Sequence, residues 1–259
     1  MSAILPSATD LDNLFRKHHG DPRNHGWRVR MRYWFGYFPS EQWYEGVVER
    51  LVIAGCRWID VGGGKCVFPH NTKLASELAD RCGALVGVDP SDNLDQNELV
   101  HERVKSMIED FRSGQTYDLA TLRMVAEHVQ NPQRVVLSLA RLLRPGGRVV
   151  IYTPNRWSPG SIVAAVIPNR LHHYFTRLMW NTNEDDVFPT FYRMNTRRTL
   201  RTLFEAGGFA EVDFMYLATC DVLARFRATC FLELCLWRFL HMLGIKYPEN
   251  SLVGVYEKK

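Results

Sequence analysis

Between residues 51 and 153, short apolar runs alternate with segments that have helical periodicity. Alternation of this kind is typical of crossover units, which build a parallel sheet with helices on both faces. We therefore expect an α/β, Rossmann-like fold with a mostly parallel seven-stranded sheet. The expected strands are 56–61, 84–89, 117–125, 148–153, a weaker one near 101–107, and two near the end at 211–219 and 251–259; the expected helices are 72–82, 131–144 and 194–208.

Two aromatic-rich pieces fall outside this repeat. We expect residues 1–44 to form an N-terminal helical and aromatic cap, and 45–259 the main domain. Within the main domain, 154–193 is an insertion after the fifth strand, placed as a cap on the substrate side. In the N-terminal piece, the arginines at 28, 30 and 32 alternate with apolar residues, which suggests a strand or sheet edge with one charged face.

Composition and charge narrow the class of protein. Hydrophobic residues make up 46% and charged residues 23% of the 259 residues, as in ordinary globular domains. The formal net charge of +4 is too small to indicate nucleic acid. Six cysteines without CxxC pairs or zinc spacing predict buried thiols in a reducing compartment, hence a cytoplasmic protein without a metal site. The amino terminus lacks the basic start and apolar core of a secretory signal.

A glycine turn follows the first strand, in the stretch WIDVGGGKCVF at 58–68. Glycine lets the backbone approach a ligand closely, because it has no side chain and accepts positive φ. A dinucleotide fingerprint would need a third glycine where Val67 stands, and no GK[ST] completes a phosphate loop. Asp60 would also repel a pyrophosphate. S-adenosylmethionine carries a sulfonium and an ammonium and no phosphate, so it suits a carboxylate at this position.

The sequence resembles the class I S-adenosylmethionine-dependent methyltransferases, in particular the small-molecule enzymes of quinone biosynthesis and natural-product tailoring. Four stretches bear the likeness, IDVGGGK, GVDPSDN, YDLATLRMVAEHV and LLRPGGRVVIYTPN. Cys66 departs from the family pattern, where a third glycine is usual. The resemblance implies that S-adenosylmethionine binds here and leaves as S-adenosylhomocysteine. The residues that it assigns to the cofactor are Asp60, Gly62, Gly63, Gly64, Asp89 (for the ribose hydroxyls), Pro90, Ile108 and Glu109 near the adenine, Leu122 and Arg123.

The acceptor side of the site is predicted from residue chemistry and position. Methyl transfer is a direct displacement, and a hydroxyl acceptor benefits from a base that removes its proton. His128, next to Glu127 just after the fourth strand, is the candidate base, and His172 and His173 are its rivals. Trp34, Tyr37 and Tyr192 are the expected lining of the acceptor pocket. Each residue also has a purely structural interpretation, either in capping the loop or in packing the aromatic pieces onto the sheet.

The predicted function is methyl transfer to a small-molecule acceptor, on oxygen rather than on nitrogen or carbon. RMVAEHV stands where DNA amino-methyltransferases carry an NPPY-type stretch, so no nucleic-acid partner is expected. One alternative is a catalytically silent, methyltransferase-like partner subunit. Another is a membrane-surface enzyme with a lipid-borne acceptor, attached through 161–180 or through an amphipathic helix at 231–245. The sequence leaves the oligomeric state open.

Overall fold

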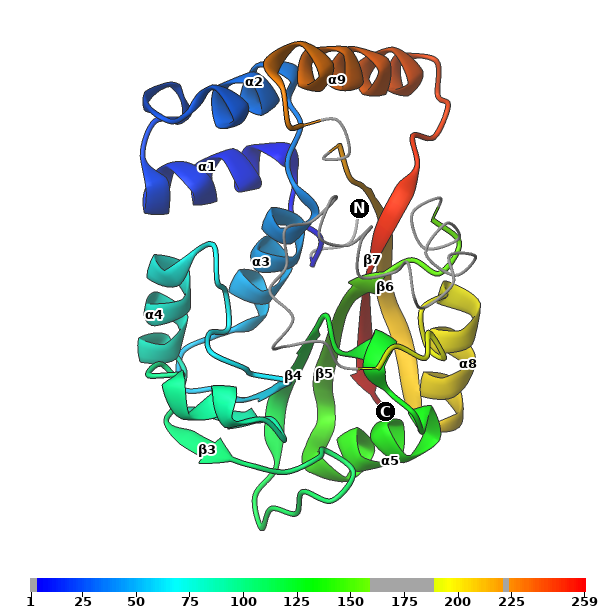
Figure 1. The fold of residues 1–259 in the computed structure, drawn as a ribbon. Coiled ribbons are helices and arrows are strands. Elements are labelled where there is room, and N and C mark those ends of the chain that lie inside the picture. Colours follow the sequence, from blue (N-terminus) through cyan, green and yellow to red (C-terminus); the bar gives the residue numbers. More distant parts are fainter. Residues whose placement is uncertain (1–3, 159–188, 221–223) are drawn as a thin grey trace.

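The computed structural model describes residues 4–158, 189–220 and 224–259. Its centre is a seven-stranded sheet in the order β3-β2-β1-β4-β5-β7-β6 (Figure 1). β7 runs antiparallel to both of its neighbours, and the other strand pairs are parallel. The predicted mostly parallel, Rossmann-like α/β fold is confirmed.

The element bounds agree with the expected alternation. The strands are β1 Arg57–Val61, β2 Ala84–Val88, β3 Glu102–Val104, β4 Tyr117–Arg123, β5 Leu143–Pro154, β6 Phe209–Ala218 and β7 Glu249–Lys258. The α-helices are α1 Ala8–His19, α2 Trp27–Phe35, α3 Ser40–Leu51, α4 Thr72–Arg81, α5 Pro132–Leu142, α8 Arg197–Ala206 and α9 Arg227–Met242. Short 3-10 helices are η1 Pro22–Asn24, η2 Asp92–Gln96 and η3 Ala126–His128.

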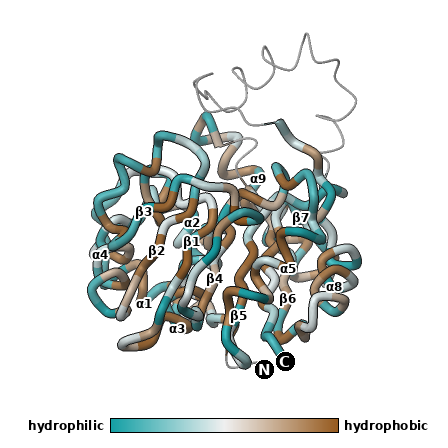
Figure 2. The backbone as a smooth tube through the Cα atoms, turned by 90° about the horizontal axis from the view of Figure 1, so that it is seen from below, coloured by the Kyte–Doolittle hydropathy of each residue, from teal (hydrophilic) through white to brown (hydrophobic). Residues whose placement is uncertain are grey.

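The central strands of the sheet send alternate side chains into two apolar layers, one on each face. In β1, Ile59 and Val61 face α5 and α8, whereas Trp58 faces α3 and α4. This follows from the two-residue period of a strand and explains why the strands of a doubly covered sheet are apolar on both faces. Figure 2, which looks along the strands, shows these hydrophobic strands between the flanking helices.

The N-terminal segment joins the main core. Ile4 and Tyr44 belong to the same buried cluster as Trp58 of β1, and Leu11 of α1 is 1% exposed. Ser7 caps α1 through a reciprocal pair of bonds with Asp10. α3 spans Ser40–Leu51 and therefore crosses the expected boundary between 44 and 45, so that boundary does not coincide with the end of an element.

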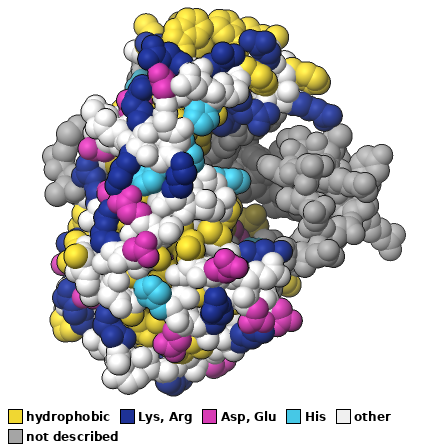
Figure 3. Space-filling model, turned by 90° about the vertical axis from the view of Figure 1, so that its left-hand side faces the viewer, with side chains coloured by type: hydrophobic (Ala, Val, Ile, Leu, Met, Phe, Trp, Pro, Cys, Tyr) yellow, Lys and Arg dark blue, Asp and Glu magenta, His cyan; other side chains and the backbone are white. Residues whose placement is uncertain are grey.

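The strand expected from the alternating arginines is wrong, because residues 27–35 form the helix α2. Arginine and methionine have good helix propensity, and Gly36 ends the helix in the left-handed conformation with φ +69°. α2 packs beside α9 at the top of the molecule in Figure 1, above the edge where β6 ends and β7 begins. In Figure 3 hydrophobic side chains gather over this end of the molecule.

Candidate active site

The carboxyl ends of three neighbouring strands place the predicted cofactor residues together. Val61, the last residue of β1, aligns with Val88 of β2 and with Leu122 of β4. The residues at or just beyond these ends therefore meet at one edge of the sheet. Open α/β sheets bind their ligands at this edge, next to the point where the strand order reverses.

The glycine turn begins directly after β1. Gly62 donates its backbone N–H to Val88 O at 2.8 Å and has φ +71°. A Cβ at this position would lie 2.2 Å from Val125 Cγ2, so the close neighbour of Gly62 is a protein side chain. Gly64, with φ +41°, has no atom closer than 3.9 Å to such a Cβ. The open space in the turn is thus at Gly64, whereas Gly62 is required by the fold itself.

Gly63 lies between these two and packs against the first acid. A Cβ there would be 3.4 Å from Asp60 Oδ2, and its carbonyl accepts a hydrogen bond from Asn97 Nδ2 at 2.9 Å. The turn is therefore fixed on both sides, by the strand edge and by the loop after β2.

Asp60 is a buried carboxylate that accepts few hydrogen bonds. It is 4% exposed and accepts one bond, from Thr121 Oγ1 at 2.6 Å, while Trp58 Nε1 donates to the same Thr121 hydroxyl at 2.7 Å. Burial raises the pKa of Asp60 to about 7, although Thr121 and the Arg123 guanidinium oppose the rise. Among the residues that the structure describes, no cation lies within ion-pair distance of Asp60. A bound sulfonium or ammonium would satisfy its charge, so the residues fit S-adenosylmethionine.

Asp89 closes the turn from the neighbouring strand. Its Oδ2 accepts the backbone N–H of Gly64 at 3.0 Å, and its Oδ1 accepts the N–H and hydroxyl of Ser91 at 2.8 and 2.6 Å. The carboxylate is therefore already oriented at the end of β2. Pro90, between Asp89 and Ser91, is exposed in the same turn.

The four remaining cofactor candidates differ in what their side chains contact. Leu122 is fully buried in the core, so only its backbone reaches the edge. Ile108 is 6% exposed and packs in the layer of α5, with half-buried Glu109 beside it after β3. Arg123 lies 3.7 Å from Glu41 of α3. Burial raises the pKa values of Asp60 and Glu127, and the charge of Arg123 opposes this rise.

Glu127, His128 and Tyr192 come together beyond β4. The Glu127 carbonyl accepts the N–H groups of Phe191 and Tyr192 at 2.7 and 3.1 Å, and its side chain accepts the Thr153 hydroxyl at 2.7 Å. Burial raises the pKa of Glu127. Half-buried His128 places Nδ1 3.0 Å from the carbonyl of Pro189.

Tyr192 has an unusual backbone. Its φ is +50°, a conformation that non-glycine residues rarely adopt and that is enriched at functional sites. Burial and the nearby Glu127 raise the pKa of its phenol. The predicted acceptor residue Tyr192 thus bonds through its backbone to Glu127, which precedes His128 in the chain.

The other predicted acceptor residues lie elsewhere or fall outside the described residues. Tyr37 is buried, with its hydroxyl donating to Ala218 O at 3.1 Å and accepting from Cys220 N at 2.9 Å. Trp34 is 74% exposed and stacks on Phe231 of α9 at 6.3 Å. Both rings contact the region of α9 rather than the glycine turn. His172 and His173 lie outside the described residues.

The sequence alone did not identify the polar residues whose hydrogen bonds hold the side chains of Asp60 and Glu127. Thr121 aligns with Asp60 across β1 and β4, which only the strand register reveals. Asn195 donates to Thr153 Oγ1 at 2.7 Å and so extends the bond that holds Glu127. A third buried acid, Glu45 of α3, accepts from Asn71 at 3.0 Å, and burial raises its pKa to about 7.

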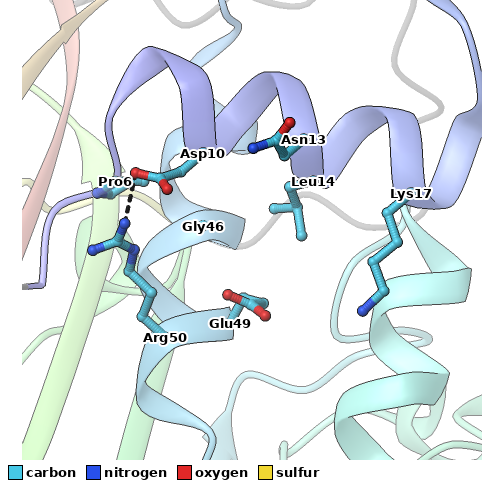
Figure 4. A pocket seen from close by; sticks show the side chains of 8 residues that line it. All are labelled: Pro6, Asp10, Asn13, Leu14, Lys17, Gly46, Glu49 and Arg50. Carbon is cyan, nitrogen blue, oxygen red and sulfur yellow. Dashed lines mark hydrogen bonds and ion pairs between the residues drawn. The ribbon is translucent and has the colours of Figure 1, made fainter.

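A surface pocket lies away from this edge. It has a volume of about 430 Å³ and opens between α1 and α3 (Figure 4). Asp10 and Arg50 pair across it at 2.6 Å, and none of the predicted site residues lines it. No cluster of metal-ligating side chains occurs among residues 4–158, 189–220 and 224–259, and no helix in these ranges is long and apolar enough to cross a membrane.

The comparison with known proteins decides the family. The family described as "Methyltransferase domain" matches residues 28–213. The chain belongs to the class I S-adenosylmethionine-dependent methyltransferase family. The predicted family and cofactor are therefore confirmed.

Individual relatives add detail to this assignment. A ubiquinone biosynthesis O-methyltransferase of Xanthomonas oryzae is 34% identical over 142 residues, covering 49% of this chain. The chain spans 59% of the length of that relative. Two solved structures share the fold, an S-adenosylmethionine-dependent methyltransferase of Mesorhizobium loti (19% identity, TM-score 0.53, 83% of this chain and 98% of that one) and a [4+2]-cyclase (14% identity, TM-score 0.50, 100% and 99%).

Proposed function

We propose that this methyltransferase transfers the methyl group to a hydroxyl oxygen of a small organic acceptor. The observation that supports the proposal most directly is the cluster of Glu127, His128 and Tyr192 at the carboxyl end of β4, the same edge that presents Asp60 and Asp89. The name of the Xanthomonas relative, an O-methyltransferase, favours oxygen as the receiving atom.

In this proposal each acid has one task toward the cofactor. Asp89 accepts the two ribose hydroxyls, and Asp60 compensates the positive charge of the methionine portion. Gly64 leaves room for the backbone to approach the ligand. When bound, S-adenosylmethionine supplies an electrophilic methyl group, and the chain contributes mainly by positioning the acceptor in line with it.

The imidazole of His128 is assigned to the acceptor. A phenol or alcohol is a poor nucleophile until its proton leaves, and histidine has the pKa best matched to take it near neutral pH. The bond between His128 Nδ1 and the Pro189 carbonyl selects the tautomer with the proton on Nδ1. Glu127, whose carboxylate is held by Thr153, positions the loop that presents His128.

The proposal is tested by two measurements on the full chain. Calorimetric titration with S-adenosylmethionine measures cofactor binding, and transfer of an isotopically labelled methyl group to a panel of hydroxylated aromatic and aliphatic compounds measures turnover. Binding together with transfer to hydroxyl acceptors supports the proposal. Transfer only to amine or carbon acceptors refutes the choice of oxygen, and binding without any transfer would instead support the silent-subunit alternative.

A further inference from the structure

Helix α9 is apolar on two opposite faces. The outward stripe is formed by Leu232, Leu236, Phe239 and Leu243, which are spaced by four, three and four residues and lie on one face at 3.6 residues per turn. Their exposures are 63%, 50%, 57% and 56%. Large apolar side chains scattered singly on a surface are ordinary, but a continuous stripe on one helix indicates an interaction surface.

The inward face of α9 already provides the contacts that hold the helix in place. Cys230 and Leu234 are fully buried with Tyr37, and Trp237 packs edge-on against the Tyr37 ring at 5.3 Å. These residues are offset by about half a turn from the outward stripe. The outward stripe is therefore not needed to attach α9 to the protein.

The surroundings of the stripe are strongly basic. Segments 27–35 and 224–248 contain six arginines and one lysine but a single carboxylate, Glu233. The lysine, Lys246, pairs with Glu249 at 3.1 Å, so the excess charge comes from the arginines. Glu233 is 2% exposed and accepts a bond from the Tyr247 hydroxyl at 3.1 Å, so it does not offset the surface charge. Within the described part of the chain, neither Arg30 nor Arg227 forms an ion pair with a carboxylate. Figure 3 shows Lys and Arg side chains around the hydrophobic ones at this end of the molecule.

The exposed aromatic and apolar groups extend from α9 onto α2. Trp34 of α2 is 74% exposed and stacks on Phe231, and Met242 at the end of α9 is 77% exposed. We call the surface formed by Trp34, the four-residue stripe, Met242 and the flanking Arg30, Arg227 and Arg238 the α2–α9 face.

We propose that the α2–α9 face docks on an anionic lipid bilayer. A second copy of the chain would bring arginine against arginine across a symmetric contact, with no exposed carboxylate on either helix to compensate. An anionic membrane surface matches both properties, because apolar and aromatic groups enter the boundary of the acyl chains while arginines meet the headgroups. The face lies above the carboxyl edge of the sheet in Figure 1, so docking holds that edge close to the bilayer.

The inference goes beyond the proposed function, and its test needs neither cofactor nor acceptor. The full chain is floated with vesicles of phosphatidylcholine alone and with vesicles containing about one third phosphatidylglycerol. We expect binding to the anionic vesicles that weakens as salt is raised. The triple change Leu232→Ser, Leu236→Ser and Phe239→Ser should reduce the partition coefficient at least about tenfold, because these groups lose their apolar contact.

A second variant tests charge separately and leaves the stripe intact. Arg30→Gln with Arg227→Gln should also reduce partitioning about tenfold or more, since each basic residue near an anionic surface contributes roughly 1 kcal/mol. Matched controls are Leu137→Ser, an exposed apolar residue of α5, and Arg112→Gln with Arg198→Gln, and these should bind like the unaltered chain.

Three results would overturn the proposal. The first is no flotation with anionic vesicles, and the second is equal binding to neutral and anionic vesicles. The third is that the unaltered chain does not bind vesicles but self-associates in sedimentation, and that the stripe variant does not self-associate. That result would assign the face to a second copy of the chain.

Discussion

Replacing Asp60 by asparagine should stabilise the free protein and weaken cofactor binding, with both effects depending on pH. Burial raises the pKa of Asp60 from 3.8 to about 7. A difference of about three pKa units corresponds to about 4 kcal/mol, at 1.36 kcal/mol per unit. Because the folded state holds this proton more tightly than the unfolded chain, Asp60 lowers the free energy of unfolding progressively between about pH 4 and pH 7.

Asparagine does not ionise, yet its amide oxygen still accepts the Thr121 hydroxyl that lies 2.6 Å from Asp60. The stability advantage of the variant over the unaltered protein should therefore grow by about 2–3 kcal/mol from pH 5 to pH 8. Urea unfolding at several pH values measures this gain, and Asp80→Asn on the exposed side of α4 is the control. Subtracting the free energy of unfolding of the unaltered protein from that of Asp60→Asn at each pH leaves the contribution of Asp60, because all other titrating groups are the same in both.

Cofactor binding should change in the opposite direction. S-adenosylmethionine affinity in the unaltered protein should rise as pH increases through about 7, because the carboxylate then carries its charge. In Asp60→Asn the affinity should be at least about tenfold weaker at pH 8 and lose this pH dependence. A stability difference that stays constant from pH 5 to pH 8 would refute the reasoning, since it would mean that Asp60 ionises as an ordinary surface acid does.

Three further predictions follow from the same edge of the sheet. Asp89→Ala should weaken S-adenosylmethionine binding by about 1.5–3 kcal/mol in calorimetric titration, and unchanged affinity would show that the ribose lies elsewhere. Gly62→Ala should lower the free energy of unfolding by about 1–3 kcal/mol, because its Cβ meets Val125 Cγ2 at 2.2 Å and its φ is +71°; adding Val125→Ala should restore part of the loss, and no recovery would contradict the contact. His128→Ala should reduce turnover roughly 10²–10⁴-fold with little effect on cofactor affinity, whereas Gln130→Ala in the same loop should not, and equal turnover in both variants would remove His128 as the base.

The fold could be predicted from the sequence because its signal is local. Apolar runs of strand length, each followed by a helical segment, specify crossover units, and the acids Asp60 and Asp89 mark strand ends without knowledge of the partner strands. The helix α2 was missed for an equally local reason. Three arginines at every second position imitate the period of a strand, and the helix is decided by side-chain propensity and by Gly36 at its end.

The site could be predicted only in part, because its support depends on strand register and on long-range contacts. Thr121 reaches Asp60 across two strands that are 61 residues apart in the chain. The contact that requires glycine at position 62 is also long-range, since a Cβ there would lie 2.2 Å from Val125 Cγ2. The sequence alone does not distinguish an aromatic residue of a pocket from one that packs in the protein. The Tyr37 hydroxyl, for example, bonds to the backbone of Ala218 and Cys220 at the end of β6.

The bond pattern at Glu127 determines which substitutions the loop after β4 tolerates. The peptide carbonyl of Glu127, not its side chain, accepts the N–H groups of Phe191 and Tyr192. A main-chain anchor survives almost any substitution, so a change of the Glu127 side chain leaves these two bonds to the returning chain in place. The path of the chain at this position is therefore set by the backbone, and a replacement of the carboxylate acts on its bond to the Thr153 hydroxyl instead.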